Sequence, residues 1–162
     1  MINACEDVPR LLEFSPSAIE LIPEDLVRLA KSVPAYAPNA RFFNDSAGAF
    51  LAVEFSGREP ADLKNLRKLG SNTITIAESQ ADQEAIWATR EVGLGLFDSG
   101  FSRIRPIAFI EDCAIPVENL GEFVRQLQRI FQECSVNATY YAHASAGCLH
   151  VRPMLDIRSS HG

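Results

Sequence analysis

The stretch from Tyr140 to Pro153 constrains the fold more than any other part of the chain, because it has the pattern of strand, turn and strand. Val, Leu and Tyr favour extended backbone, and the small-residue run Ala-Ser-Ala-Gly between them is typical of a turn. A turn symmetric about Ala146 and Gly147 places His143 directly opposite His150, with Cβ atoms about 5 Å apart. The sequence therefore predicts an antiparallel hairpin.

Alternation along the two strands decides which side chains share a face of this hairpin. Tyr141 and Arg152 fall on the face of the two histidines, whereas Leu149 and Val151 fall on the other, apolar face. Two neutral imidazoles at this separation can share a divalent metal, and a guanidinium matches a carboxylate bidentately. The alternative is that both histidines are ordinary strand residues with local hydrogen bonds, and residue types alone leave both interpretations open.

Apolar periodicity and turn residues predict the other elements of the chain. Strands are indicated at residues 15–21, 48–56, 72–77 and 106–115, with the hairpin strands at 136–143 and 149–157. Helices are indicated at residues 23–31, 60–69, 80–96 and 117–133, and residues 33–46 are interpreted as a loop. Ser79 and Asp82 resemble a capping box at the start of the third helix.

This order of elements supports an α+β fold, with an antiparallel or mixed sheet and helices packed on one face. The sequence shows no internal repeat, low-complexity segment or interior boundary, so residues 1–162 are expected to form a single domain with its own core.

Charged residues inside apolar segments are candidates for pairing or for ligand binding. Glu111 and Asp112 interrupt an otherwise apolar strand, so they lie at an edge, pair with an arginine or ligate something, and pairing is the expected outcome. Arg90, on the helix predicted at 80–96, has a purely structural interpretation as a surface residue paired with Glu84 or Glu91.

Composition excludes several classes of function. The net charge of −6 argues against a nucleic-acid partner, and no apolar run approaches the roughly 18 residues that a membrane-spanning helix needs. The first ten residues lack the apolar core of a signal peptide. The four cysteines are widely spaced without a Cys-x-x-Cys pair, which favours reduced thiols and a cytoplasmic location over a disulfide framework or zinc ribbon.

The segment His-Ala-Ser-Ala-Gly-Cys-Leu-His-Val-Arg-Pro, starting at His143, resembles the His-x-Gly-Asp-Gly-Asn-x-His signature of the FAD-linked 2-hydroxyacid oxidoreductases. These include D-lactate and D-2-hydroxyglutarate dehydrogenases and the glycolate oxidase large subunit, and the signature lies in their C-terminal cap domain. The variant is most similar to that of long members that carry an iron–sulfur module. Residues 86–91 and 109–116 also resemble segments of this family, and the whole resemblance runs from about residue 17 to residue 157.

The resemblance implies a ferredoxin-like core and a role in binding a small 2-hydroxy carboxylate. It implies that His143 and His150 hold a divalent metal, with zinc expected, and that Arg90 faces the substrate carboxylate. The remaining substrate-binding candidates share the hairpin face and are Tyr141, Cys148 and Arg152. Two positions depart from the signature, since its Asp is Ala146 here and its Asn is Cys148.

The sequence lacks a glycine-rich nucleotide-binding motif, a phosphate-binding loop and an iron–sulfur cysteine run. FAD is therefore expected on an FAD-binding domain absent from this sequence, and an iron–sulfur cluster only in a missing module, so the chain alone should be inactive. The resemblance also implies a further metal-binding carboxylate downstream of Gly162.

Two alternative functions belong to other classes of protein. One is a stand-alone ferredoxin-like module that binds a ligand or forms a homodimer without catalysis. The other, a metal-dependent hydrolase built on the two histidines, is the weaker, because no His-Glu-x-x-His motif is present.

Overall fold

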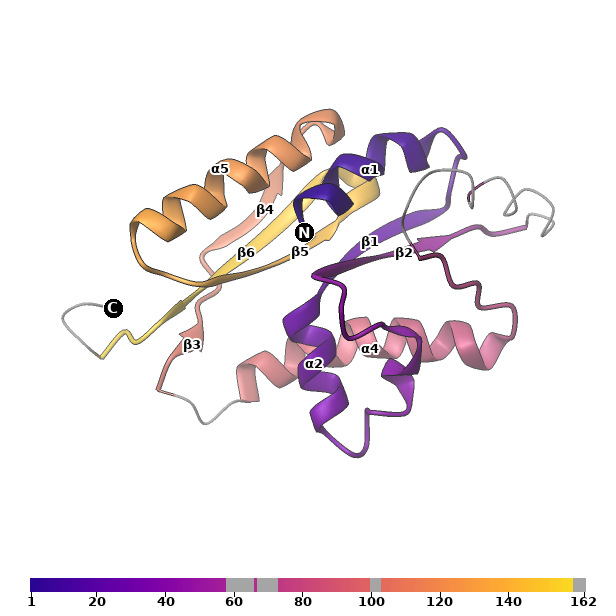
Figure 1. The fold of residues 1–162 in the computed structure, drawn as a ribbon, viewed down its shortest axis with the longest axis horizontal. Helices are drawn as coiled ribbons and strands as arrows, with labels where there is room; N and C mark the ends of the chain where they lie inside the picture. Colours follow the sequence, from indigo (N-terminus) through magenta and orange to yellow (C-terminus); the bar gives the residue numbers. More distant parts are fainter. Residues whose placement is uncertain (58–65, 67–72, 100–102, 159–162) are drawn as a thin grey trace.

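The computed structural model describes residues 1–57, 66, 73–99 and 103–158, and Figure 1 shows the arrangement of its elements. The helices are α1 (Ile2–Leu12), α2 (Glu24–Ser32), α4 (Gln80–Ser99) and α5 (Leu120–Glu133), with single 3₁₀ turns η1 (Asn39–Phe42), η2 (Val117–Asn119) and η3 (Ala144–Ala146). The strands are β1 (Ala18–Pro23), β2 (Ala49–Glu54), β3 (Arg105–Pro106), β4 (Ile110–Ala114), β5 (Ala138–His143) and β6 (Cys148–Leu155). Within the described residues, no helix combines the length and the apolar character needed to cross a bilayer.

The six strands form one sheet in the order β2-β1-β5-β6, and both β3 and β4 pair with successive parts of β6. Each of the pairings between these strands is antiparallel. The predicted α+β class with an antiparallel sheet is thereby confirmed.

Helices α1 and α5 cover one face of the sheet. The core beneath them contains fully buried residues from the two helices and from the inward positions of β1, β5 and β6, namely Cys5, Val8, Leu120, Val124, Ile19, Leu21, Ala142, Leu149 and Val151. Alternation along β1 sends Ile22 to the opposite face, where it packs with Leu26, Val27 and Ala30 of α2.

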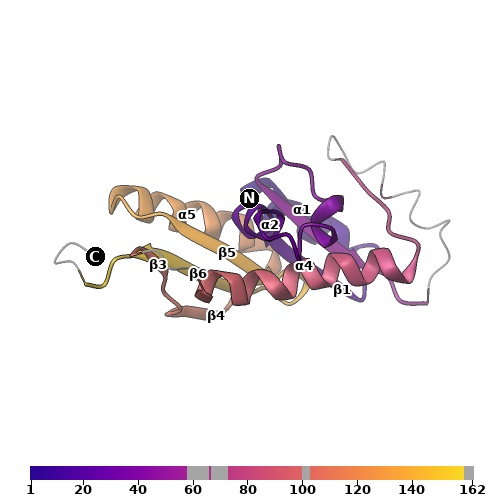
Figure 2. The same cartoon turned by 90° about the horizontal axis from the view of Figure 1, so that it is seen from below.

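The sequence analysis placed the helices on one face only, whereas α2 and α4 lie on the other. Figure 2 shows α4 and α5 on opposite sides of β5 and β6. A second cluster of buried residues explains the difference, because it unites β1, α2 and η1, with Ile86 of α4 against it. The face that carries the two histidines is therefore partly covered by α4.

Several predicted elements differ from the structure. Helix α1 was missed; its Cys5 and Val8 are buried against α5, a tertiary contact that local sequence does not reveal. No strand forms at residues 73–77, and the strand predicted at 106–115 is divided into β3 and β4 by residues 107–109. The helix predicted at 60–69 falls, apart from residue 66, outside the described residues.

The hairpin register differs from the prediction by two residues. His143 pairs with Cys148, and Tyr141 pairs with His150, so the two histidines are diagonal neighbours and not directly opposite. The turn differs from the predicted one because η3 is followed by Gly147 in the left-handed conformation, with φ of 65°, and β6 begins at Cys148, one residue earlier than predicted. A shift by an even number of residues leaves every side chain on its predicted face, so the shared face of the histidines is confirmed.

Replacing Gly147 with alanine is expected to destabilise the fold by more than about 2 kcal/mol, because backbone strain and a steric clash add together. The left-handed backbone costs a residue with a Cβ about 1–2 kcal/mol. In addition, a Cβ here would lie 1.9 Å from the carbonyl oxygen of Ile115. Gly57 is a matched control, since its φ is 70° but a Cβ there has nothing within 4 Å. Urea denaturation of both variants measures the difference between their losses of unfolding free energy. Equal losses of stability would contradict the steric argument.

Candidate functional site

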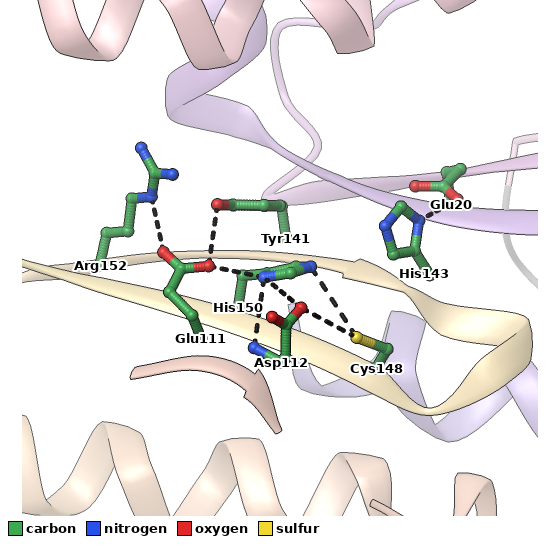
Figure 3. A network of polar contacts seen from close by, with 8 residues as sticks. All are labelled: Glu20, Glu111, Asp112, Tyr141, His143, Cys148, His150 and Arg152. Carbon is green, nitrogen blue, oxygen red and sulfur yellow. Dashed lines mark hydrogen bonds and ion pairs between the residues drawn. The ribbon is translucent and has the colours of Figure 1, made fainter. Parts of the chain in front are cut away.

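Two histidines lie side by side on the hairpin face that looks toward α4. Their ring centroids are 5.6 Å apart and the ring planes are nearly perpendicular, at 85°. His143 is half exposed, with 49% of its side chain accessible, whereas only 11% of the His150 side chain is accessible. Figure 3 shows both rings with the polar residues around them. The structure thus brings together the pair that the sequence analysis selected.

Each imidazole is held by a glutamate from a neighbouring strand. His143 Nδ1 is 2.7 Å from Glu20 Oε1 on β1, and His150 Nδ1 is 2.6 Å from Glu111 Oε2 on β4. An ionised carboxylate can only accept a hydrogen bond, so the proton of each contact lies on Nδ1. A neutral imidazole with this tautomer carries its lone pair on Nε2. Both rings therefore have the orientation and tautomer that carboxylates impose on metal-binding histidines.

The same two glutamates each bind an arginine with their second oxygen. Arg90 Nε on α4 lies 3.1 Å from Glu20 Oε2, and Arg152 Nε lies 3.0 Å from Glu111 Oε1. Both arginine side chains are 14% accessible. The site therefore contains two His–Glu–Arg units, which are His143–Glu20–Arg90 and His150–Glu111–Arg152.

Tyr141 lies between the two units. Its ring stacks on His150 with a centroid distance of 4.6 Å and an interplanar angle of 14°. The Cζ atoms of Arg90 and Arg152 lie 5.8 and 5.4 Å from the ring centroid, and the hydroxyl donates to Glu111 Oε2 at 3.3 Å. Burial raises the pKa of the Tyr141 hydroxyl, which keeps it a neutral hydrogen-bond donor. Tyr141 thus fixes the spacing between the units.

The site differs from the predicted one in its ion pairs, which join residues far apart in the sequence. The pairing of Glu111 with an arginine is confirmed, but Arg90 pairs with Glu20 and not with Glu84 or Glu91. Glu20 was missed by the sequence analysis. Its signal was a single carboxylate inside the apolar strand β1, where a buried charge needs a partner.

An irregularity in β4 adds a second carboxylate beside His150. The pairing of β4 with β6 shifts between Ile110 and Cys113, and Asp112 has a φ of 54°. Such a bulge turns a side chain away from its regular direction, so Glu111 and Asp112 both reach His150 although they are adjacent. Asp112 Oδ1 lies 3.7 Å from His150 Nδ1, and Cys148 Sγ lies 3.8 Å from the same oxygen. Burial and the Asp112 carboxylate raise the pKa of the Cys148 thiol.

Removing the Glu111 carboxylate is expected to destabilise the protein by about 2 kcal/mol, because His150 and Arg152 would remain largely buried without it. The comparison is Glu111→Ala against Glu133→Ala, whose partner Arg129 and own side chain are both more than two-thirds exposed. The exposed pair should contribute less than about 0.5 kcal/mol. Thermal and urea unfolding of both variants measure the two losses of unfolding free energy. Similar losses of stability would show that Glu111 has no special structural role.

Comparison with known proteins identifies the family to which this chain belongs. Residues 2–161 match the family described as FAD linked oxidases, C-terminal domain. The chain is 34% identical to D-2-hydroxyglutarate dehydrogenase of Haemophilus influenzae over 95% of its length, and 27% identical to that of Pseudomonas putida over 97%. It is 25% identical over 98% of its length to the glycolate oxidase subunit GlcD of Bacillus subtilis.

The chain corresponds to only part of these relatives. It covers 17% of the two dehydrogenases and 32% of the glycolate oxidase subunit. Because the family match extends over nearly the whole chain, the chain belongs to the family of C-terminal domains of FAD-linked oxidases.

Proposed function

We propose that this chain is the substrate-binding cap domain of an FAD-dependent dehydrogenase or oxidase that acts on 2-hydroxyacids of the D-lactate, glycolate or D-2-hydroxyglutarate class. The observation that carries the proposal is the pair of His–Glu–Arg units around Tyr141 on one face of the sheet. Family members combine this domain with an FAD-binding domain, and similarity of the His143–Pro153 segment favours the long members with an iron–sulfur module.

The donor chemistry of the face fits a divalent metal. His143 and His150 would hold it through Nε2, because each Nδ1 is already engaged by a glutamate. The chemistry that such a metal would supply is Lewis-acid polarisation of the hydroxyl oxygen and the adjacent carboxylate of a 2-hydroxyacid. Glu20 and Glu111 keep the two imidazoles in their metal-binding tautomer and limit their rotation.

The two arginines supply recognition of the substrate carboxylate. Their Nε bonds to glutamates fix the guanidinium planes on either side of Tyr141, so the groups are oriented before substrate arrives. A positioned cation favours the ionised carboxylate that a 2-hydroxyacid carries at neutral pH. A flavin held by the FAD-binding domain would supply the hydride acceptor.

Zinc binding tests the role of the two histidines. We expect the purified chain to bind Zn²⁺ in a calorimetric titration and His143→Ala to weaken the affinity at least about tenfold, the lower end of the loss seen for residues that only support metal ligands. Glu133→Ala, on the exposed face of α5, should bind like the wild type. Unchanged affinity in His143→Ala would contradict the two-histidine assignment.

Activity tests the role of the whole domain. With added FAD and an electron acceptor, the chain alone should not oxidise D-2-hydroxyglutarate, D-lactate or glycolate. A chimera carrying the chain in place of the matching segment of the Haemophilus influenzae dehydrogenase should oxidise a 2-hydroxyacid. Arg90→Lys in the chimera should lower kcat/KM, because an ammonium cannot reproduce bidentate binding.

The chimera's flavin absorbance serves as the folding control. Turnover by the chain alone would contradict its dependence on a second domain. A flavin-loaded chimera inactive toward all three acids would contradict the substrate class.

A further inference from the structure

A groove of about 740 Å³ lies at one end of the face that carries the two histidines. Small-molecule sites have volumes of about 300–1,000 Å³, so the groove is large enough for a ligand. Its walls come from α2, from the C-terminal part of α4, from residues 104–106, from the start of β5 and from the end of β6. No residue of the two His–Glu–Arg units lines it, so the groove is a separate feature of the domain.

The course of β6 makes this groove a continuation of the histidine face. Arg152 and Met154 follow His150 at intervals of two residues, so alternation puts all three side chains on one face. Figure 3 shows the near part of this row, with Arg152 on the side of His150 away from His143. Met154 lines the groove, and it lies four residues, or about 13 Å, along the strand from His150.

A hydrogen bond from β5 to α2 marks where the groove begins. Thr139 is paired with Arg152 in the hairpin, and its Oγ1 donates to Asp25 Oδ1 at 3.1 Å. Asp25 also lines the groove. The groove therefore starts at the level of Arg152, two residues or about 7 Å along β6 from His150.

The lining of the groove suits an apolar ligand. Five apolar side chains contribute to it, namely Leu29, Leu96, Ile104, Pro106 and Met154. The Asp25 carboxylate in its wall is already bonded to Thr139. The Arg28 guanidinium pairs with Glu24 at 3.5 Å, and Arg105 is exposed to water. The charged groups of the lining therefore do not require a charged ligand, whereas the apolar side chains gain by covering an apolar one.

We infer that this groove binds the side chain of the 2-hydroxyacid, so that the domain favours acids with an apolar side chain of about six to eleven carbons. The inference rests on the proposed function, because it places the hydroxyl and the carboxylate of the acid at the histidines and arginines. The lengths follow from the distances along β6, since three atoms of an extended chain span about 3.5 Å. About six carbons cover the roughly 7 Å to the start of the groove, and about eleven cover the roughly 13 Å to Met154. The side chains of glycolate, lactate and 2-hydroxyglutarate are too short to reach it.

The dependence of the chimera's activity on chain length tests the inference. Each methylene buried in the groove contributes about fourfold to kcat/KM, so the value for D-2-hydroxydodecanoate should exceed that for D-2-hydroxybutanoate at least about tenfold. Ile104→Glu places a charge in the groove and should remove this preference. Ile130→Glu is the matched control, because Ile130 is 48% exposed against 51% for Ile104 and lies on α5, on the other side of the sheet. This control should keep the preference of the wild type.

The outcomes separate this inference from the proposed function. An active chimera that prefers the short acid, or whose preference for the long acid survives in Ile104→Glu, overturns the inference and leaves the proposed function intact. A flavin-loaded chimera inactive toward every acid overturns the proposed function, and calorimetry of the chain alone with D-2-hydroxydodecanoate, below its micelle concentration, then decides on the groove.

In that titration, binding that Ile104→Glu weakens at least about tenfold supports the groove as the site of the acid's side chain. Absent binding, or binding that the variant leaves unchanged, overturns the inference. Because Ile104 is half exposed, its substitution should not unfold the domain, and thermal melting of each variant checks this.

Discussion

The site depends on two glutamates whose charges are largely withdrawn from water. Glu20 is held on β1 beneath α4, and Glu111 is held at the β4 edge of the sheet. A carboxylate in such a position is tolerated only when cations or hydrogen-bond donors satisfy it. Each glutamate meets this need with one imidazole and one guanidinium, and in doing so it fixes the position of both.

This arrangement joins parts of the fold that the backbone alone does not connect. The Glu20–Arg90 pair ties α4 to β1, and the Glu111–Arg152 pair adds side-chain contacts to the pairing of β4 with β6. Most of the groups project from strands and not from loops, which holds them more precisely than flexible segments can. The same interactions therefore stabilise the domain and fix the positions of its histidines and arginines.

Parts of this picture followed from the sequence because they depend on local periodicity. The shared face of Tyr141, His143, His150 and Arg152 was predicted correctly, since alternation survives an even shift in register. The register itself was not predicted correctly, because it depends on the geometry of η3 and of Gly147, which has a left-handed conformation.

Other parts depend on tertiary structure and could not be read from local patterns. The bond between Arg90 and Glu20 joins residues 70 positions apart, and nothing local marks one as the partner of the other. The direction of Asp112 depends on a bulge formed against β6, and α1 is specified by its packing on α5.

The pairing of β1 with β5 has a consequence for how the domain forms. It joins Glu20 to His143, so residues separated by more than three-quarters of the chain become neighbours in the middle of the sheet. The entropy of closing such a long loop must be overcome before these contacts can stabilise anything, which slows folding. During synthesis, β1 and β2 emerge long before β5 does. The face that carries the two histidines is therefore assembled only after β5 and β6 have left the ribosome.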